Sequence, residues 1–235
     1  MAFKNYLFRA ILRPMYRLYM QGKDALSAII DVLMPRSART MRTIARTETD
    51  IPLLPAAHHL LDTDITTLMD YRNPAVQDLI RSLKYDGAGH SAHICAMILA
   101  DYLQEEISVG RSYSPREILL VPIPLHPARR RKRGFNQISV VLDRLPKRLR
   151  DGTAATLAPQ VLIRTKETAQ QARLPRTERI KNMYDAFEVP DKADVRTSRI
   201  FLIDDVTTTG ATLASAAKAL RQAGAEVVPI ALARA

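Results

Sequence analysis

One stretch near the C-terminal end of this 235-residue chain, residues 201–212, restricts the possible folds more than any other. It reads Phe-Leu-Ile-Asp-Asp-Val-Thr-Thr-Thr-Gly-Ala-Thr. The apolar start predicts a buried strand that ends at Asp204 and Asp205, and Gly210 allows the turn into a helix over residues 211–223. Because ligands of open α/β sheets bind beyond the carboxyl ends of the strands, the stretch predicts a binding site there.

The residues that follow the predicted strand suit a sugar phosphate. Backbone N–H groups at a helix N-terminus, with threonine hydroxyls beside them, bind a phosphate monoester. The carboxylates of Asp204 and Asp205 would accept hydrogen bonds from vicinal ribose hydroxyls. A Cβ at position 210 would block close approach of the backbone to the ligand. The phosphate loop is predicted to comprise Val206, Thr207, Thr208, Thr209, Gly210, Ala211 and Thr212. The alternative is an acidic turn whose threonines only cap a helix.

Strand and helix patterns alternate from residue 117 onward. Strands are predicted over residues 117–124, 160–164, 199–203 and 226–232, and helices over residues 136–149 and 211–223. This alternation predicts an α/β fold with a doubly wound, mainly parallel sheet over residues 117–235. Two amphipathic helices, one starting at Asn73-Pro74 and one over residues 91–107, are predicted to make a helical cover within residues 71–116.

The first seventy residues lack this pattern. Residues 1–34 are basic and intermittently apolar, which predicts a helical extension that either docks on the protein or touches a membrane or nucleic acid. Residues 35–70 are rich in Thr, Arg, Asp and Pro, so we expect a linker or an irregular small subdomain. For His58 and His59, a surface loop is favoured over a metal site, because no cysteine or suitably spaced acid accompanies them.

Composition limits the class of protein. Hydrophobic residues make up 47% and charged residues 25%, which is ordinary for a globular protein, and no apolar run reaches the length of a membrane span or resembles a signal peptide. The formal charge of +11 favours anionic partners such as nucleotides, pyrophosphate or nucleic acid. The single cysteine, Cys95, excludes an intramolecular disulfide and a Cys-based zinc cluster, and fits core packing in a cytoplasmic protein.

A basic run, residues 129–133, follows the first predicted core strand. If the strands are parallel, it lies at the same end of the sheet as the two acids, where guanidinium groups could clamp a pyrophosphate. A nucleic-acid patch and a solvated surface are the alternatives. The polar first part of residues 165–182 predicts a hairpin, a mobile loop that excludes water from a reactive phosphate ester, or a simple connection, and a short helix is predicted from Pro175. The candidate pyrophosphate and loop residues are Arg129, Arg133, Gln137, Gln171 and Arg179.

Three blocks of sequence occur in one order. The first is Val121-Pro-Ile-Pro-Leu-His-Pro with Arg133-Gly-Phe-Asn-Gln137. The second is Arg164 with Thr168, Gln171, Leu174, Glu178-Arg179, Asn182 and Ala186-Phe187, and the third is Ile203-Asp-Asp-Val-Thr-Thr-Thr-Gly-Ala-Thr212. Together they resemble the ComF family of competence-associated, type I phosphoribosyltransferase-like proteins over residues 71–235. The third block alone resembles the 5-phosphoribosyl-1-pyrophosphate (PRPP) motif of type I phosphoribosyltransferases.

The resemblance implies a type I phosphoribosyltransferase fold that binds PRPP, with Mg²⁺ held mostly by the ligand and not by protein side chains. One implied function is phosphoribosyl transfer to an unidentified acceptor, with Asp204 and Asp205 on the ribose hydroxyls. The other is a non-catalytic PRPP or nucleotide sensor that works with single-stranded DNA or a DNA-uptake machinery. ComF-like chains usually carry an N-terminal zinc ribbon, but residues 32–41 contain no Cys-x-x-Cys motif. No zinc-dependent role is therefore expected for this region.

Overall fold

The computed structural model describes residues 38–85, 89–113, 116–127, 131, 134–165 and 186–235. The chain divides into two compact units, residues 1–41 and 42–235. Helix α3 (Ala38–Ile44) spans the boundary between them, and every other element described below belongs to the second unit. The helical extension predicted for residues 1–34 lies outside the described residues.

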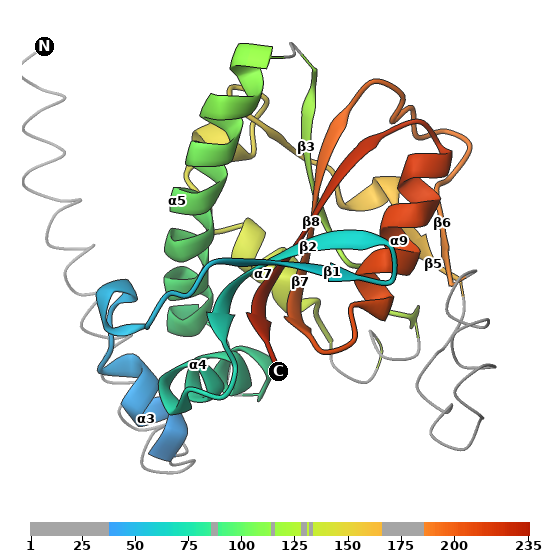
Figure 1. Cartoon of the computed structure of the whole chain (residues 1–235). Helices are drawn as coiled ribbons and strands as arrows, with labels where there is room; N and C mark the ends of the chain where they lie inside the picture. Colours follow the sequence, from blue (N-terminus) through green and yellow to red (C-terminus); the bar gives the residue numbers. More distant parts are fainter. Residues whose placement is uncertain (1–37, 86–88, 114–115, 128–130, 132–133, 166–185) are drawn as a thin grey trace, which may run out of the picture. The chain divides into compact units, whose positions relative to one another are not determined.

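A six-stranded sheet with the order β1-β2-β8-β7-β3-β4 forms the centre of the second unit (Figure 1). Strands β1 and β2 are antiparallel, and all other neighbouring pairs are parallel. The strands are β1 (Ala56–Leu60), β2 (Thr63–Asp70), β3 (Ile118–Pro122), β4 (Thr156–Leu157), β7 (Arg199–Thr207) and β8 (Glu226–Arg234). A separate antiparallel pair joins β5 (Ile163–Arg164) to β6 (Phe187–Glu188). The predicted α/β fold with a mainly parallel sheet is confirmed.

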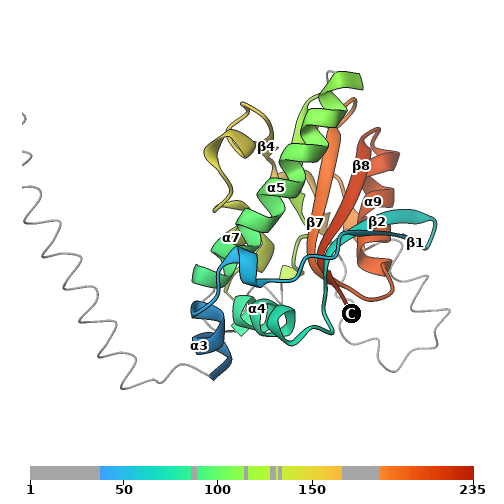
Figure 2. The ribbon, with the colours of Figure 1, turned by 60° about the vertical axis from the view of Figure 1, so that its left-hand side comes forward.

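Helices cover both faces of the sheet, as Figures 1 and 2 show. On one face lie α4 (Pro74–Tyr85), α5 (Gly89–Tyr113) and α7 (Gln137–Leu142), and on the other lies α9 (Ala211–Gln222). Strand β7 contributes side chains to the hydrophobic cores on both faces of the sheet, because successive side chains of a strand point to opposite faces. Phe201 and Ile203 belong to the core on the α5 side, whereas Ile200 and Leu202 belong to the core on the α9 side. Short 3₁₀ helices η2 (Glu48–Asp50), η3 (Lys147–Leu149) and η4 (Pro159–Val161) complete the described elements.

Local sequence explains where the covering helices begin and end. The predicted start of α4 is confirmed, since Asn73 Oδ1 accepts from the Ala75 N–H at 2.9 Å and Pro74 is the first helical residue. The helix predicted over residues 136–149 is shorter than expected and ends at Leu142. Pro146 accounts for the difference, because proline lacks the N–H that a continuing helix requires and clashes with the preceding turn.

The prediction of a linker or an irregular small subdomain over residues 35–70 is wrong from residue 56 onward, where β1 and β2 form a hairpin and β2 joins the central sheet. His58 and His59 therefore lie on a strand and not in a surface loop. The sequence lacks the usual hydrophobic pattern of a strand here because β2 buries threonines in place of apolar residues. Thr63 is 4% exposed and Thr67 is 2% exposed. Threonine is β-branched and favours strands although it is polar.

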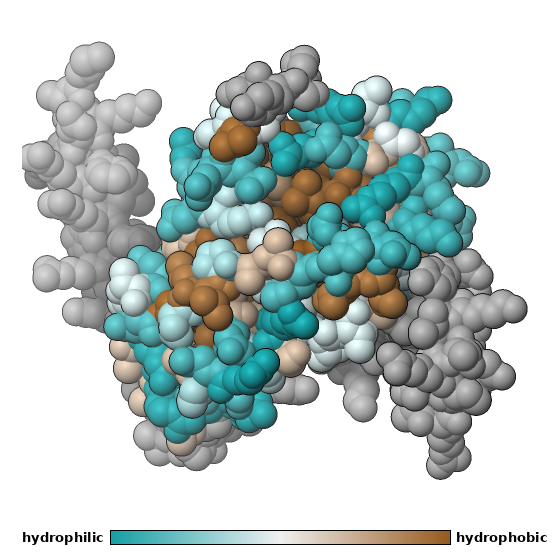
Figure 3. Space-filling model, viewed as in Figure 1, coloured by the Kyte–Doolittle hydropathy of each residue, from teal (hydrophilic) through white to brown (hydrophobic). Residues whose placement is uncertain are grey.

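Within the described ranges, every helix is too short or too polar to cross a bilayer. Polar side chains cover most of the face shown in Figure 3, and apolar ones gather in separate patches. Cys95 is fully buried on α5, which confirms its predicted place in the core.

Candidate functional site

The order of the strands reverses between β3 and β7. From β3 the chain passes through α7 to β4 on one side, and from β7 it passes through α9 to β8 on the other. The two connections cross opposite faces of the sheet, because α7 packs in the α5-side core and α9 in the other. In open α/β sheets, ligands bind outside the carboxyl ends of the strands at such a reversal. The topology therefore predicts a ligand site at the carboxyl ends of β3 and β7.

Strand β7 extends beyond β3 at this end of the sheet. Pro122, the last residue of β3, is opposite Ile203, and the Ile123 N–H donates to the Ile203 carbonyl at 2.8 Å. Asp204, Val206 and Thr207 continue to pair with β8, but no described residue of β3 lies opposite them. The strand predicted to end at the acid pair therefore includes both acids, and one edge of their backbone lies beyond the end of β3.

The two carboxylates leave β7 toward opposite faces. Asp204 is opposite Ala231, which belongs to the α9-side core. Asp205 alternates to the other face, where burial, and secondarily the charge of Asp205, raise the pKa of the Cys95 thiol to about 12. Each carboxylate accepts from the next backbone N–H, Asp204 from Asp205 at 2.8 Å and Asp205 from Val206 at 2.7 Å. Asp204 thus shares its face with α9, and Asp205 faces α5.

A short loop, residues 207–210, connects β7 to α9. Thr207 is buried opposite Arg234, and its carbonyl accepts from the Ala235 N–H at 3.0 Å. Thr208 and Thr209 are exposed at the tip. The first-turn residues Ala211 and Thr212 are half-buried, and the helix N-terminus receives no side-chain cap from residue 210. The loop therefore presents hydroxyls and the uncapped start of a helix.

Gly210 has two structural reasons to be glycine. Its φ of 78° lies in the left-handed region, which side chains other than glycine rarely adopt. A Cβ at this position would also lie 2.8 Å from Ile65 Cδ1 and 2.8 Å from Leu60 Cβ, both on the β1–β2 hairpin. The hairpin thus supports the end of the loop, a contact that sequence reasoning missed. Close approach of a ligand to Gly210 stays a prediction.

Asn136 and Gln137 lie at the exit of β3. Asn136 Nδ2 donates to the Ile123 carbonyl at 2.9 Å, and its Oδ1 accepts from the Ile138 N–H at 3.0 Å, which ties the start of α7 to β3. Gln137 is 2% exposed, and its Nε2 finds no acceptor among the described residues. A buried amide donor in that state is destabilising unless something else accepts from it. The other candidates, Arg129, Arg133, Gln171 and Arg179, lie outside the described residues.

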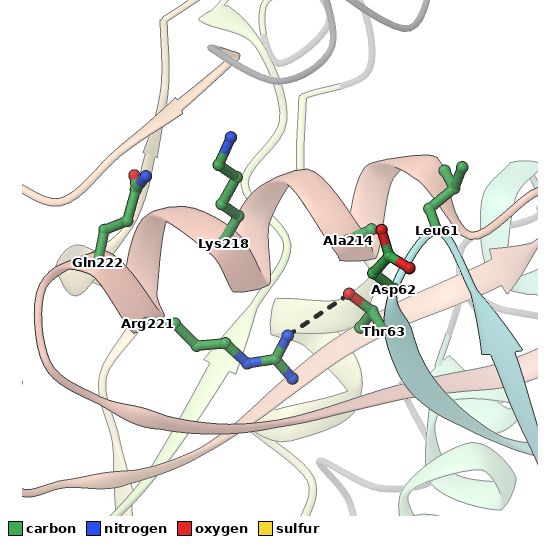
Figure 4. Close-up of a pocket in the computed structure, with 7 residues that line it drawn as sticks. All are labelled: Leu61, Asp62, Thr63, Ala214, Lys218, Arg221 and Gln222. Atoms are coloured by element: carbon green, nitrogen blue, oxygen red, sulfur yellow. Dashed lines mark hydrogen bonds between the residues drawn. The ribbon is translucent and has the colours of Figure 1, made fainter.

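A hollow of about 530 Å³ lies away from the acid pair, between the hairpin turn and α9 (Figure 4). Its lining consists of Leu61, Asp62, Thr63, Ala214, Lys218, Arg221 and Gln222. Arg221 donates to Thr63 Oγ1 at 3.4 Å and to the Val227 carbonyl at 3.2 Å. The first bond fixes the hairpin to the last turns of α9, and the second fixes α9 to β8. No group of three or more potential metal ligands occurs in the part of the chain that the structure describes.

Residues 111–234 match the phosphoribosyl transferase domain family. The DNA utilization protein YhgH of Escherichia coli (strain K12) is 30% identical over 170 residues, which are 71% of this chain and 69% of that protein. The competence protein ComFC of Streptococcus pneumoniae is 31% identical over 161 residues, which are 66% of this chain and 61% of that protein.

Solved structures give weaker similarities. A hypoxanthine phosphoribosyltransferase from Staphylococcus aureus is 12% identical, with 59% of this chain and 60% of that chain covered and a TM-score of 0.34. The adenine phosphoribosyltransferase of Saccharomyces cerevisiae is 13% identical, with 85% and 89% covered and a TM-score of 0.34. TM-scores this low carry no argument about this chain.

Proposed function

Because the chain belongs to the phosphoribosyl transferase domain family and, within it, to the ComF family, we propose that it binds PRPP at the carboxyl end of β7. One observation carries the proposal. Two carboxylates and a hydroxyl-rich loop that opens a helix meet where the strand order reverses. This is the position at which an open α/β sheet binds its ligand.

The ribose would lie against the edge of β7 that extends past β3. Asp204 would reach it from the α9 face and Asp205 from the α5 face, so that each carboxylate accepts from a different hydroxyl. The 5′-phosphate would lie at the 207–210 loop, because the first N–H groups of a helix have no partner within the helix. This arrangement assigns a separate part of the ligand to each part of the site.

The pyrophosphate would extend toward the exit of β3. Gln137 is a described donor on that side, and its buried Nε2 would gain an acceptor from a phosphate oxygen. Mg²⁺ would be held mostly by PRPP itself, because it prefers phosphate and water oxygens. The ion would supply charge neutralisation at the pyrophosphate when PRPP is bound.

Transfer of the phosphoribosyl group is the reaction that such a site would support. Loss of pyrophosphate breaks the bond at the anomeric carbon and leaves positive charge on the ribose ring, while an acceptor nitrogen or oxygen forms the new bond. The protein would contribute by fixing the ring with Asp204 and Asp205 and by stabilising the departing pyrophosphate. The described residues do not identify the acceptor.

Titration calorimetry with Mg²⁺-PRPP tests the proposed binding. We expect a dissociation constant between about 1 μM and 1 mM, the range in which enzymes usually hold their substrates. Ribose 5-phosphate should compete, because it carries the groups assigned to the acid pair and the loop. Absence of binding at millimolar Mg²⁺-PRPP would contradict the proposal. Pyrophosphate release, measured across nucleobases and amines, then separates a transferase from a sensor that binds without turnover.

A role with DNA is a second candidate. It rests on the names of the two relatives, a DNA utilization protein and a competence protein, and on the formal charge of +11. If the protein binds single-stranded DNA through phosphate contacts, the logarithm of the affinity should fall by about 0.7 per contact for each tenfold rise in salt. Fluorescence anisotropy of a labelled oligonucleotide between 50 and 200 mM salt, about the range in which such losses are large, measures this slope. An affinity that does not change with salt would contradict the role.

A further inference from the structure

The two ends of the 207–210 loop rest on strands that are far from it in sequence. The loop starts at Thr207, which is opposite Arg234 on β8. It ends at Gly210, which packs against Ile65 on β2. Ile65 is in turn opposite His58 on β1. Arg234 and His58 are thus neighbours of the two ends of the loop.

Arg234 and His58 are also hydrogen-bonded to each other. Arg234 Nη1 donates to His58 Nδ1, so the arginine side chain reaches across β2 to β1. His58 Nε2 lies 3.0 Å from Thr67 Oγ1. A guanidinium group can only donate, so Nδ1 is the acceptor, and the ring is neutral with its proton on Nε2, directed at the threonine. Because Thr67 is opposite Ala231 of the α9-side core, these hydrogen-bonded side chains lie on the α9 face of the sheet, the face from which the loop leads into α9.

The loop itself carries no charged side chain, since residues 206–212 are Val, Ala, Gly and four threonines. A phosphate monoester there would bring a charge of about −1.5 to −2 at neutral pH. Lys218 lies about two turns into α9, beside the hollow at the turn of the hairpin. Arg234 is the described cation that the strand register places next to the loop.

We propose that Arg234, held in position by neutral His58, is the cation that balances a phosphate bound at the 207–210 loop. The inference rests on the proposed function, because it assigns a further residue to the same site. Arg234 is a binding residue in this assignment, and His58 is a positioning residue that acts through it. The β1–β2 hairpin is then part of the ligand site.

Protonation of His58 would undo the arrangement. A charged imidazole has no acceptor for Arg234 and places a second cation beside it. Burial, and secondarily the charge of Arg234, lower the pKa of His58, so the neutral ring persists to lower pH than in a free histidine. The charged groups around His58 come from several elements. Asp204 lies on the same face of β7, and Asp70 is opposite Arg234 and accepts from the Arg72 N–H. The 207–210 loop has no titratable group, and Lys218, Arg221 and Asp62 lie beside the hollow. Among these groups, His58 is the only histidine, the side-chain type whose charge changes closest to neutral pH.

The first test replaces the cation. Arg234→Met keeps much of the apolar stem and removes the charge, and we expect ribose 5-phosphate to bind about 10- to 100-fold more weakly, as for loss of a hydrogen bond to a charged group. Calorimetry with ribose 5-phosphate measures the change, and thermal unfolding confirms that the variant folds. If wild-type protein binds ribose 5-phosphate and Arg234→Met binds it equally well, the inference is wrong although the proposed function stands. If wild-type protein does not bind, the proposed function fails.

The second test uses pH and does not depend on Arg234→Met folding. His58→Gln offers a neutral acceptor to Arg234 and cannot titrate. We expect the affinity of wild-type protein for ribose 5-phosphate to fall more steeply from pH 7.5 to about 5.5 than that of His58→Gln, whose loss should reflect the phosphate alone, with its pKa of about 6. His59→Gln is the matched control, because His59 is exposed on the same strand and bonds to Asp64 at 2.8 Å. Equal pH profiles in wild-type protein and His58→Gln would overturn the inference.

Discussion

Gly210→Ala is expected to lower the free energy of unfolding by about 2–5 kcal/mol, since two penalties combine at this position. The left-handed φ of 78° costs a residue with a side chain about 1–2 kcal/mol. The new Cβ would also lie 2.8 Å from Ile65 Cδ1 and from Leu60 Cβ, and overpacking of this kind costs about 1–3 kcal/mol. Urea denaturation of the wild type and the variant measures the sum. We also expect weaker binding of ribose 5-phosphate, because relief of the contact would move the loop off the hairpin.

Gly152→Ala separates the two penalties. Gly152 has a φ of 93°, but a Cβ there would meet nothing closer than Thr156 Oγ1 at 3.8 Å. This control should therefore lose only the conformational part, about 1–2 kcal/mol. In the double variant Gly210→Ala with Ile65→Val, loss of the Ile65 Cδ1 atom should recover part of the stability. Equal losses in Gly152→Ala and Gly210→Ala would show that the hairpin does not press on the loop.

The central part of the fold could be predicted because its signals are local. The apolar run before Asp204, the glycines at 210 and 224 and the apolar stripe of α9 specify a strand, a turn and a helix within one stretch of chain. The apolar stripe of α4, formed by Val76, Leu79, Ile80 and Leu83, is fully buried, as expected for the amphipathic helix predicted there. Such elements follow from periodicity and caps alone.

The hairpin could not be predicted in the same way. Strand β2 is stabilised by pairing with β8, where Thr66 is opposite Ile230, a partner far along the chain. Its inward positions include threonines, which a hydrophobic pattern counts as polar. A tight turn at Leu61 and Asp62, both with positive φ, also lacks the glycine or asparagine that usually marks such a turn. Pairing with β8 thus produces a strand in a segment whose local sequence signals favour a linker.

The candidate site shows the same division. Its acids and threonines were visible as a motif, but the orientation of the acids depends on how far β7 extends, which pairing with β8 determines. Arg234 and His58 carry no motif, and only the strand order brings them together. Residues that the order of the strands brings into a site cannot be identified from a single sequence.

Replacing either acid by its isosteric amide is expected to weaken PRPP binding by about 10- to 100-fold, the effect of losing a charge-assisted hydrogen bond. Asp204→Asn and Asp205→Asn keep the size of the side chain and an oxygen for the next backbone N–H, so the fold should be retained. Asp101→Asn removes the same charge at an exposed position on α5 that is not part of the motif, and this variant should bind normally. Calorimetry with Mg²⁺-PRPP measures all three variants.

Opposite orientation of Asp204 and Asp205 makes a sharper prediction about the sugar. If each carboxylate holds a different hydroxyl, then 2-deoxyribose 5-phosphate has already lost the partner of one of them. One of the two variants should then bind the deoxy sugar as well as wild-type protein does, while the other should still lose about 10-fold or more. With ribose 5-phosphate, both variants should lose affinity. Equal losses on both sugars would mean that the two acids do not divide the hydroxyls between them, and that the ribose does not lie across the edge of β7.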